Sequence, residues 1–274
     1  MPELPEIETV KRTLSPLLCG KSFTDCTLFN ETVIKHPQPA LFARRIIGRQ
    51  IREISRRGKY LLLHLDDGAV LAAHLRMTGR LLYAPADRPL KPHTHVVCAL
   101  SDGCRLCYTD VRRFGRLWLI EPGETDDFTG MSALGIEPLS PEFGPEYLQS
   151  ALGKRSAAVK QGLLDQHVLA GLGNIYADES LFAAGICPCR GANSLNEEEW
   201  RRLAAAIPPV LQAAIEHNGT TFRDYVDGEG KEGENLPFLQ AYSRAGQPCF
   251  RCGTPLLKIK VGGRGTVYCP HCQK

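Results

Sequence analysis

The stretch CFRCGTPLLKIKVGGRGTVYCPHC, residues 249–272, contains two Cys-x2-Cys pairs separated by sixteen residues. Each pair presents two thiolates on one tight turn, and two such turns supply the four tetrahedral ligands of a structural zinc ion. Glycine and basic residues between the pairs are typical of a β-hairpin that carries positive charge. The alternative for these four cysteines is two disulfides. We favour one structural zinc ion, with no coordination position open for chemistry, bound by Cys249, Cys252, Cys269 and Cys272.

The other seven cysteines do not suggest a second zinc site. Cys104 and Cys107 have the same local spacing, but they lie in an alternating apolar stretch. Residues three apart in a strand point to opposite faces, so this pair cannot bind one ion. We interpret the remaining thiols as reduced core or surface residues, which predicts a reducing compartment; they are Cys19, Cys26, Cys98, Cys187 and Cys189. We find no charged-then-apolar leader and no apolar run of membrane length, so we expect a cytoplasmic protein.

Positive charge is concentrated in a few parts of the chain. The 274 residues carry a net charge of +3 and are enough for two domains and a small appendage. Residues 244–274 contain six Lys or Arg and no Asp or Glu, whereas the other 243 residues sum to −3. Further basic runs lie within residues 44–59 and 154–160. A basic run is commonly a solvated face, but a basic zinc hairpin together with two further basic runs favours a phosphate-binding surface.

Periodicity predicts a helix followed by strands in the first half of the chain. Residues 5–18 have apolar side chains at helical spacing, with Pro5 in the first turn and two glutamates near the positive end of the helix dipole. Alternating apolar runs then flank Asp-Asp-Gly and Ser-Asp-Gly, which are hairpin signals. The repetition predicts a two-sheet β-sandwich, with strands at residues 60–65, 69–75, 94–100 and 105–108.

The second half of the chain is predicted to be mainly helical. Residues 133–147 are rich in Pro and Gly and are predicted to form a linker. Ser194 and Glu197 have the spacing of a capping box and precede an apolar stripe that ends at Gly219. Residues 226–237 are glycine-rich and almost without apolar side chains, which predicts a mobile loop, either a plain connection or a lid over a pocket.

The amino terminus, Met1-Pro-Glu-Leu-Pro-Glu, suggests a nucleophile. Initiator methionine is ordinarily removed before proline, which would leave the secondary amine of Pro2 at the start of the chain. An α-amino group titrates near ~8, so on the order of a tenth is neutral at pH 7. Such an amine can attack a sugar carbon and form an iminium, with Glu3 as a proton donor or acceptor. Taken alone, however, Pro-Glu-x-Pro-Glu is more often a simple helix start than a catalytic centre.

The motifs taken together resemble the bacterial formamidopyrimidine-DNA glycosylases, which repair oxidised purines. The resemblance rests on residues 1–10, on the zinc hairpin and on three internal motifs, Arg56-Arg-Gly-Lys-Tyr60, His74-Leu-Arg-Met77 and Asp110-Val-Arg-Arg-Phe-Gly115. It continues through LDQHVLAGLGNIYADES, residues 164–180, which is similar to the family's helix–two-turns–helix motif. It therefore runs the full length of the chain, and it shows no departure at the catalytic positions.

The resemblance implies a base-flipping glycosylase and lyase. Pro2 would attack the anomeric carbon, Glu3 would protonate the opening deoxyribose, and Lys59 would contact a phosphate and assist proton transfer. Met77, Arg112 and Phe114 would fill the stack that the flipped base leaves. For Met77 and Phe114 the alternative is core packing at strand ends, and for Lys59 it is a solvated turn lysine.

The same resemblance implies further DNA contacts. Arg264 matches a hairpin arginine that reaches the lesion phosphates and is included with the catalytic residues. Predicted base-recognition residues are Thr220 and Thr221, in the damaged-base loop. The remaining predicted DNA-binding residues are His74, His93, Arg155, Lys160 and Asn174.

We therefore predict an α+β protein in three segments. Residues 1–135 would form an N-terminal helix and β-sandwich, residues 136–238 a helix–two-turns–helix domain with a lesion-recognition loop, and residues 239–274 the zinc finger. The expected partner is duplex DNA containing oxidised purines, with no small-molecule cofactor, no membrane and a monomer as the default state. The alternatives are an endonuclease VIII-type oxidised-pyrimidine glycosylase, disfavoured by Leu4, a non-catalytic zinc DNA-binding protein, and a zinc-stabilised protein-interaction module.

Overall fold

The computed structural model describes residues 1–274, which group into two compact units. The first unit contains residues 1–132 and 217–234, and the second contains residues 133–216 and 235–274. Residues 217–234, predicted as part of the central segment, thus group with the N-terminal residues, and the zinc hairpin groups with the helices. The division into three segments stays a prediction. No helix is both long and apolar enough to cross a membrane.

The first unit is a sandwich of two β-sheets. One sheet has the strand order β1-β7-β8-β6 and the other has the order β2-β9-β5-β4-β3. Neighbouring strands are antiparallel except for β2 and β9, which are parallel. The two-sheet architecture predicted from the hairpin signals is confirmed. The strands are β1 (Phe23–Leu28), β2 (Ile34–His36), β3 (Ile51–Arg57), β4 (Tyr60–Leu65), β5 (Val70–His74), β6 (Gly79–Pro85), β7 (Thr94–Leu100), β8 (Cys104–Asp110) and β9 (Arg116–Ile120).

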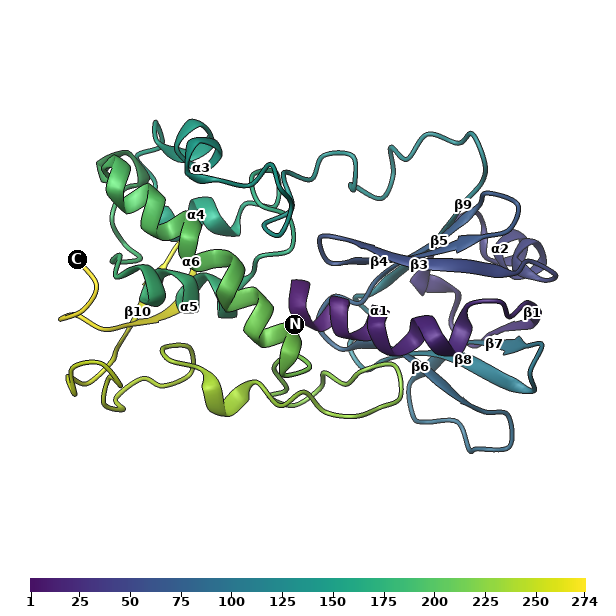
Figure 1. Ribbon diagram of the computed structural model, residues 1–274. Coiled ribbons are helices and arrows are strands. Elements are labelled where there is room, and N and C mark those ends of the chain that lie inside the picture. The colour runs from purple at the N-terminus through teal and green to yellow at the C-terminus, as the bar shows by residue number, and fades with distance from the viewer. The chain divides into compact units, whose positions relative to one another are not determined.

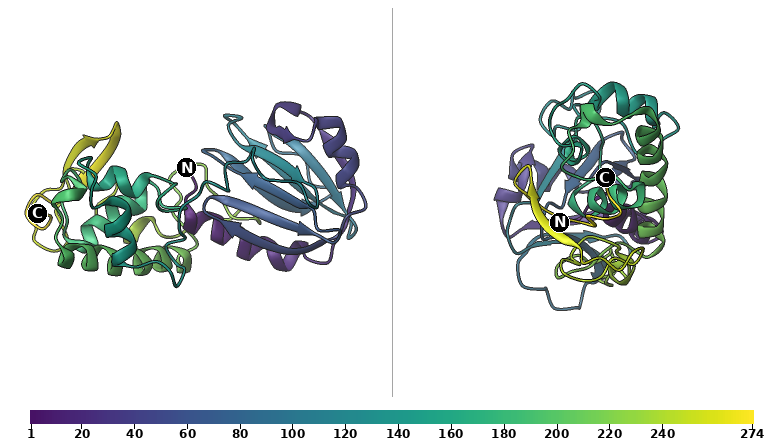
Figure 2. Two further views of the ribbon diagram at one scale, coloured as in Figure 1. Left: turned by 90° about the horizontal axis from the view of Figure 1, so that it is seen from above. Right: turned by 90° about the vertical axis from the view of Figure 1, so that its left-hand side faces the viewer.

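Two helices cover the edges of the sandwich. Helix α1 (Leu4–Leu18), the predicted N-terminal helix, lies along β3 and also contacts β4 and β6 (Figures 1 and 2). Helix α2 (Pro39–Ile46) contacts β1 and β2, and the short 3-10 helix η1 spans Glu31–Val33. Since β3, β6, β1 and β2 are the outermost strands, the helices cover backbone edges that would otherwise invite pairing with other chains. Apolar side chains of both helices join the core between the sheets.

The second unit is built around helix α5. Its residues 175–182 are all buried, and it contacts α4, α6 and the hairpin strand β11. A helix that is buried on all sides belongs at the centre of a domain. The elements of this unit are α3 (Pro145–Leu152), α4 (Val159–Leu164), α5 (Asn174–Ala184), η2 (Ala192–Ser194), α6 (Glu197–Glu216), η3 (Leu236–Phe238), β10 (Leu257–Val261) and β11 (Arg264–Tyr268).

The start of α6 corrects one expectation. Asn196, rather than Ser194, begins the capping box, because its side-chain oxygen accepts the N–H of Glu199 at 2.9 Å. The Glu199 carboxylate accepts the N–H of Asn196 in return, also at 2.9 Å. Ser194 lies in η2. Arg190 pairs with Glu199 at 2.5 Å and so fixes the carboxylate that completes the capping box. This ion pair favours the box formed by Asn196 and Glu199 over the predicted one formed by Ser194 and Glu197.

The hairpin of β10 and β11 completes the second unit. Gly262 and Gly263 join the strands with φ angles of 55° and 76°, as a two-residue type I′ turn requires. Val267 of the hairpin and two of the zinc-site cysteines pack in one apolar cluster with Phe182 of α5. Figure 2 shows the hairpin projecting from the helices of this unit. The strands therefore extend into solvent from a base that is anchored on α5.

Candidate active site

Three chain connections of the first unit meet at one end of the sandwich. They are the β3–β4 turn, the β5–β6 connection and the β8–β9 connection. The strand register pairs Tyr60 with His74, His74 with Arg116, and Gly79 with Asp110, so these strand ends lie side by side. Four predicted site residues are carried to this end by the connections, namely Lys59, Met77, Arg112 and Phe114.

Two glutamates fix the first turn of α1 at the same end. Glu6 is fully buried, and its carboxylate accepts the N–H of Glu3 at 2.7 Å and the N–H of Thr220 at 2.9 Å. Glu8 pairs with Arg56, near the end of β3, at 3.2 Å. Glu3 is only 3% exposed. The amino terminus is thus held between the end of β3 and the segment that contains Thr220.

Lys59 and His74 give this end of the sandwich an unusual electrostatic character. Lys59 occupies the β3–β4 turn but is only 7% exposed, which does not fit a solvated turn lysine. His74 is buried too, and burial together with the charges of Arg76 and Lys59 lowers its pKa to about 3. The N–H of Arg76 donates to Nδ1 of His74 at 3.1 Å. The imidazole is therefore neutral at physiological pH, with its proton on Nε2.

Asp110 shapes the β8–β9 connection. Its carboxylate accepts hydrogen bonds from the Thr78 hydroxyl at 2.5 Å, the Gly115 N–H at 2.8 Å, the Tyr108 hydroxyl at 3.0 Å and the Arg112 N–H at 3.2 Å. Burial alone would raise the pKa of Asp110, but these bonds outweigh it, so the pKa is lowered. A side chain on Gly115 would clash, since its Cβ would lie 1.8 Å from the Tyr108 oxygen.

The three residues predicted to fill the vacated base stack, Met77, Arg112 and Phe114, form one exposed cluster, the wedge cluster. The Arg112 guanidinium donates to the sulfur of Met77 at 3.0 Å and lies over the Phe114 ring at 4.7 Å from its centre. Met77 is 39% exposed and Phe114 is 46% exposed. Core packing at strand ends does not account for side chains with this exposure. The neighbouring His93 is exposed as well, and its carbonyl accepts the N–H of Asp110 at 3.0 Å.

The predicted base-recognition residues belong to a hydrogen-bonded segment of the first unit. Thr220 and Thr221 are both buried. The Thr221 hydroxyl donates to the carbonyl of Tyr225 at 2.9 Å and accepts the N–H of Gly233 at 2.8 Å. Thr220 also forms a β-bridge with Glu234. Backbone and hydroxyl bonds thus close residues 220–234 into a loop that Glu6 ties to α1.

A buried ion pair organises the predicted DNA-binding residues of the second unit. Lys160 is completely buried and pairs with Asp178 of α5 at 2.6 Å. Its ammonium also donates to the Thr266 hydroxyl at 2.8 Å and to the Gly265 carbonyl at 3.2 Å. Burial raises the pKa of Asp178 to about 6, although Lys160 opposes this shift. Lys160 therefore fixes the hairpin from inside, and its direct contact with DNA stays a prediction.

The other predicted DNA-binding residues of this unit lie nearer the surface. Asn174 begins α5, and its amide donates to the carbonyl of Gly265 at 3.0 Å. Arg264 is exposed at the tip of the hairpin, next to the Gly262–Gly263 turn. Arg155 is also exposed and pairs with Asp165 at 2.9 Å. Asn174 and Lys160 thus both donate to the carbonyl of Gly265, the residue that directly follows Arg264 in the hairpin.

The four C-terminal cysteines fit a zinc ion. All four sulfurs lie within 4.8 Å of one another, and none of these cysteines is in a disulfide. The Cys249 and Cys272 sulfurs are 4.0 Å apart, and those of Cys252 and Cys269 are 3.5 Å apart. Zn–S bonds of ~2.3 Å in a tetrahedron separate the sulfurs by about 3.8 Å, so the thiol cluster has the size that zinc requires. This chain has a structural zinc site with four cysteine ligands.

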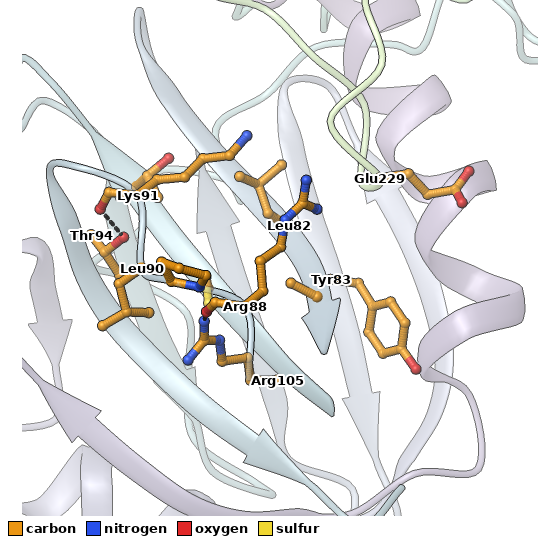
Figure 3. Close-up of a pocket in the computed structure, with 12 residues that line it drawn as sticks. Leu82, Tyr83, Arg88, Leu90, Lys91, Thr94, Arg105 and Glu229 are labelled. Carbon is orange, nitrogen blue, oxygen red and sulfur yellow. Dashed lines mark hydrogen bonds between the residues drawn. The ribbon is translucent and has the colours of Figure 1, made fainter. Parts of the chain in front are cut away.

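A small pocket on the four-stranded sheet contains none of the predicted site residues. Its lining comes from β6, β7 and β8, from the connection between β6 and β7, and from Glu229 (Figure 3). Arg88, Lys91 and Arg105 surround an apolar floor that includes Leu82. The Thr94 hydroxyl donates to the carbonyl of Lys91 at 2.7 Å and closes one side.

Three buried carboxylates position the site and were not predicted. Glu6 holds the amino terminus, Asp110 shapes the β8–β9 connection, and Asp178 anchors Lys160. Glu6 could have been found from its position three residues after Glu3 at a helix start, which is capping-box spacing. Asp110 and Asp178 lie inside quoted motifs, but sequence alone does not indicate that they are buried.

The fold and the thiol cluster define a zinc-finger protein of the α+β class. Family models match three parts of the chain: the formamidopyrimidine-DNA glycosylase N-terminal domain at residues 1–117, the H2TH domain of the same enzymes at residues 134–226, and a zinc finger found in FPG and IleRS at residues 246–274. The chain belongs to the formamidopyrimidine-DNA glycosylase family.

Individual relatives agree over the whole length. The formamidopyrimidine-DNA glycosylase of Pelotomaculum thermopropionicum is 49% identical over 274 residues, covering 100% of this chain and 99% of that protein. The enzyme of Desulforamulus reducens is 50% identical over 275 residues, with 100% and 99% covered. Among solved structures, the Lactococcus lactis Fpg in complex with DNA that contains an abasic site has a TM-score of 0.92 at 36% identity and covers 99% of both chains.

Proposed function

We propose that this protein, a DNA glycosylase for formamidopyrimidine lesions by its family, uses Pro2 as the nucleophile to excise 8-oxoguanine and ring-opened purines from duplex DNA. The observation that carries the proposal is the buried first turn of α1, in which Glu6 holds Glu3 at the end of the sandwich that also carries Lys59. Similar solved structures contain Fapy-dG DNA or abasic-site DNA, which supports both a glycosylase step and a later abasic intermediate.

The proposed reaction begins after removal of Met1. The neutral amine of Pro2 attacks the anomeric carbon, a C–N bond forms, and the bond between sugar and base breaks as the base leaves with a proton. The sugar ring then opens: the bond between the anomeric carbon and the ring oxygen breaks, and the nitrogen of Pro2 and this carbon form an iminium. The iminium acidifies the neighbouring sugar carbon, and elimination of the phosphates on both sides of the sugar leaves a gapped strand. Glu3 protonates the opening sugar, and Lys59 contacts a phosphate and assists proton transfer.

The wedge cluster supports a base-flipping step in the proposed reaction. Extruding a base costs a few kcal/mol, which an inserted apolar group and a guanidinium can offset by occupying the vacated stack. Met77 and Phe114 are exposed and are bridged by Arg112, so the three side chains are available to one DNA groove. Thr220 and Thr221 are proposed to line the path of the extruded base, close to Glu6.

The remaining predicted residues are proposed to hold the DNA backbone. Arg264 and Asn174 lie at the hairpin and at the start of α5, where an exposed guanidinium and an amide suit phosphate oxygens. His93 and Arg155 are exposed hydrogen-bond donors that suit the same role. His74 and Lys160 were also predicted to contact DNA, but both are buried, so we propose that they position the residues around them. We propose a monomer that works on duplex DNA in the bacterial cytosol, where the nucleoid lies.

Borohydride trapping tests the proposal directly. Zinc-loaded protein lacking Met1 is mixed with a duplex bearing 8-oxoguanine opposite cytosine, reduced, digested and mapped. We expect a covalent adduct on Pro2 and none in a matched protein whose amino terminus is extended by a short tag. An adduct formed only on an oxidised-pyrimidine duplex would contradict the purine assignment. Absence of any adduct, despite tight and salt-sensitive duplex binding, would indicate a DNA-binding protein without this chemistry.

A further inference from the structure

Two thiols outside the zinc site lie together on the surface of the second unit. The sulfurs of Cys187 and Cys189 are 3.0 Å apart, about 1 Å more than an S–S bond of ~2.05 Å. Cys189 is exposed and Cys187 is partly exposed, so a small molecule in solution can reach this pair. Cys26 and Cys98 form the only other such pair outside the zinc site, with sulfurs 3.4 Å apart, but both are buried between strands.

The backbone holds the two thiols in this arrangement. Residues 187–190 form a turn in which the N–H of Arg190 donates to the carbonyl of Cys187 at 3.2 Å. Pro188 occupies the second position of the turn, where its fixed φ is favoured. A proline between the two cysteines removes backbone freedom from the segment, so little ordering is needed to bring the sulfurs together.

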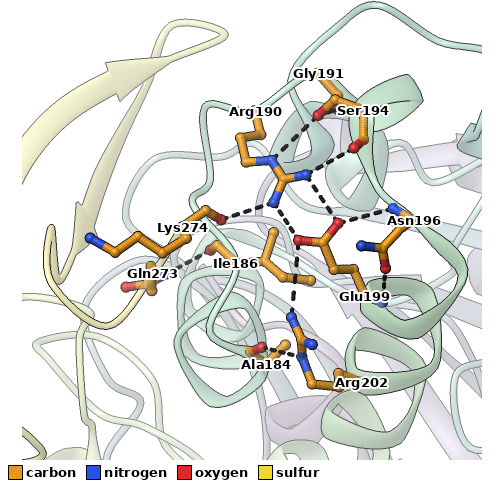
Figure 4. A network of polar contacts seen from close by, with 10 residues as sticks. All are labelled: Ala184, Ile186, Arg190, Gly191, Ser194, Asn196, Glu199, Arg202, Gln273 and Lys274. Atoms are coloured by element: carbon orange, nitrogen blue, oxygen red, sulfur yellow. Dashed lines mark hydrogen bonds and ion pairs between the residues drawn. The ribbon is translucent and has the colours of Figure 1, made fainter.

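The turn is also bound on both sides to the end of the chain. The N–H of Cys187 donates to the carbonyl of Lys274 at 2.8 Å, and the Gln273 amide donates to the carbonyl of Ile186 at 2.9 Å. The Arg190 guanidinium donates to the same Lys274 carbonyl at 3.1 Å and pairs with Glu199 of α6 (Figure 4). Residues 186–190 are therefore held between the start of α6 and the two residues that follow the zinc ligand Cys272.

We propose that Cys187 and Cys189 are a redox-active dithiol, which small-molecule disulfides of the glutathione class oxidise to an intramolecular disulfide while zinc stays bound. The zinc cysteines are protected from the same reaction because their thiolates are bound to the metal. Cys26 and Cys98 are protected because they are buried. The hydrogen bond with Cys187 raises the pKa of Cys189, so oxidation at neutral pH is slower than for an ordinary exposed thiol.

The oxidation proceeds in two exchanges. The thiolate of Cys189, which is the more exposed residue of the pair, attacks the small-molecule disulfide, forms a mixed disulfide and releases one small thiol. Cys187 loses its proton and attacks the Cys189 sulfur of this mixed disulfide. The intramolecular S–S bond forms and the second small thiol leaves. Two electrons pass from the protein to the oxidant, which ends as two reduced thiols.

Redox titration with mass mapping tests the proposal. The full-length, zinc-loaded protein is equilibrated in glutathione buffers of rising oxidised fraction, blocked with N-ethylmaleimide, unfolded and digested. We expect the peptide that contains Cys187 and Cys189 to lose two hydrogens and all maleimide labelling, while Cys26 and Cys98 remain fully labelled after unfolding and a chromogenic chelator detects no released zinc.

Single variants give the matched controls. Cys187→Ser is expected to stop the reaction at a glutathione adduct on Cys189, whereas Cys19→Ser, which removes an isolated exposed thiol, is expected to leave the disulfide unchanged. Three results would overturn the proposal: full labelling of both cysteines at every oxidised fraction, separate glutathione adducts on both without an internal disulfide, or zinc release before the pair is oxidised.

Discussion

Burial and two neighbouring cations keep His74 neutral in the folded protein. Its folded pKa of about 3 lies below the ordinary value of 6.5. We expect its imidazole resonances to show no titration between pH 8 and pH 5, whereas the same residue in denaturant regains its ordinary titration. NMR of a protein labelled at histidine, with His74→Gln to assign the signals, checks this. Titration near pH 6 in the folded state would contradict the buried, neutral imidazole.

The same shift predicts how stability depends on pH. The unfolded state takes up a proton at His74 below pH 6.5, whereas the folded state does not do so until about pH 3. The contribution of His74 to the free energy of unfolding is therefore fully present above pH 6.5 and falls as the pH is lowered from 6.5 toward 3. The slope from this group approaches ~1.4 kcal/mol per pH unit. Comparison of denaturant unfolding of the wild type and of His74→Gln isolates this term from the other titrating groups.

Glu6 is the residue through which the amino terminus is positioned. We expect Glu6→Gln to replace one of its two accepting oxygens by a donor that faces a backbone N–H, at a cost on the order of 1–3 kcal/mol. The Pro2 amine would then be misplaced, so borohydride trapping should slow more than duplex binding weakens. Glu31→Gln, an exposed carboxylate in η1, is the control. Equal losses in trapping and binding would argue against a positioning role.

At the scale of elements, the Lys160–Asp178 pair joins α4, α5 and the hairpin. Removal of one partner of a buried pair leaves an uncompensated charge and typically costs ~3–5 kcal/mol, whereas removal of both costs much less. We therefore expect Lys160→Met to lower the stability of the protein strongly and the double variant Lys160→Met/Asp178→Leu to recover most of it. Denaturant unfolding of the four proteins of this double-mutant cycle measures the coupling.

The DNA-binding role predicted for Lys160 is tested by the same variants. If the double variant keeps its stability and also keeps the salt dependence of duplex binding, Lys160 acts by fixing the hairpin. If the salt dependence falls although stability is retained, Lys160 contacts a phosphate directly.

The elements show where sequence patterns suffice. The helix at residues 5–18 and the strands at residues 60–65 and 94–100 were predictable, because their apolar periodicity coincides with a buried face. The zinc site was predictable because the spacing of the cysteines along the sequence already indicates two turns that each present two ligands to one ion. The capping box at Asn196 was not predictable, because Ser194 with Glu197 and Asn196 with Glu199 have the same spacing. The contact that favours the second pair comes from Arg190, which lies outside the capping-box pattern. Long-range pairings, such as Glu6 with Thr220, leave no local signal.

At the scale of the whole molecule, the distribution of charge matters more than its sum. The net charge of +3 would not indicate nucleic acid, but residues 244–274 hold six cations and no carboxylate side chain. Arg264 is exposed at the tip of the hairpin that zinc, Lys160 and Asn174 hold in place. A cation held in this way can meet a phosphate with little loss of conformational freedom, which is the use we propose for the zinc hairpin.

Arg264→Ala should therefore weaken duplex binding in a recognisable way. Removal of one phosphate contact reduces the slope of log K against log salt by about 1, without changing preference among sequences. Arg201→Ala is a matched control, because Arg201 is also exposed but already pairs with Glu197 and Glu198 on α6. Duplex affinity measured across a salt series should separate the two variants. An unchanged slope for Arg264→Ala, or the same loss for Arg201→Ala, would place the phosphate contacts elsewhere on the molecule.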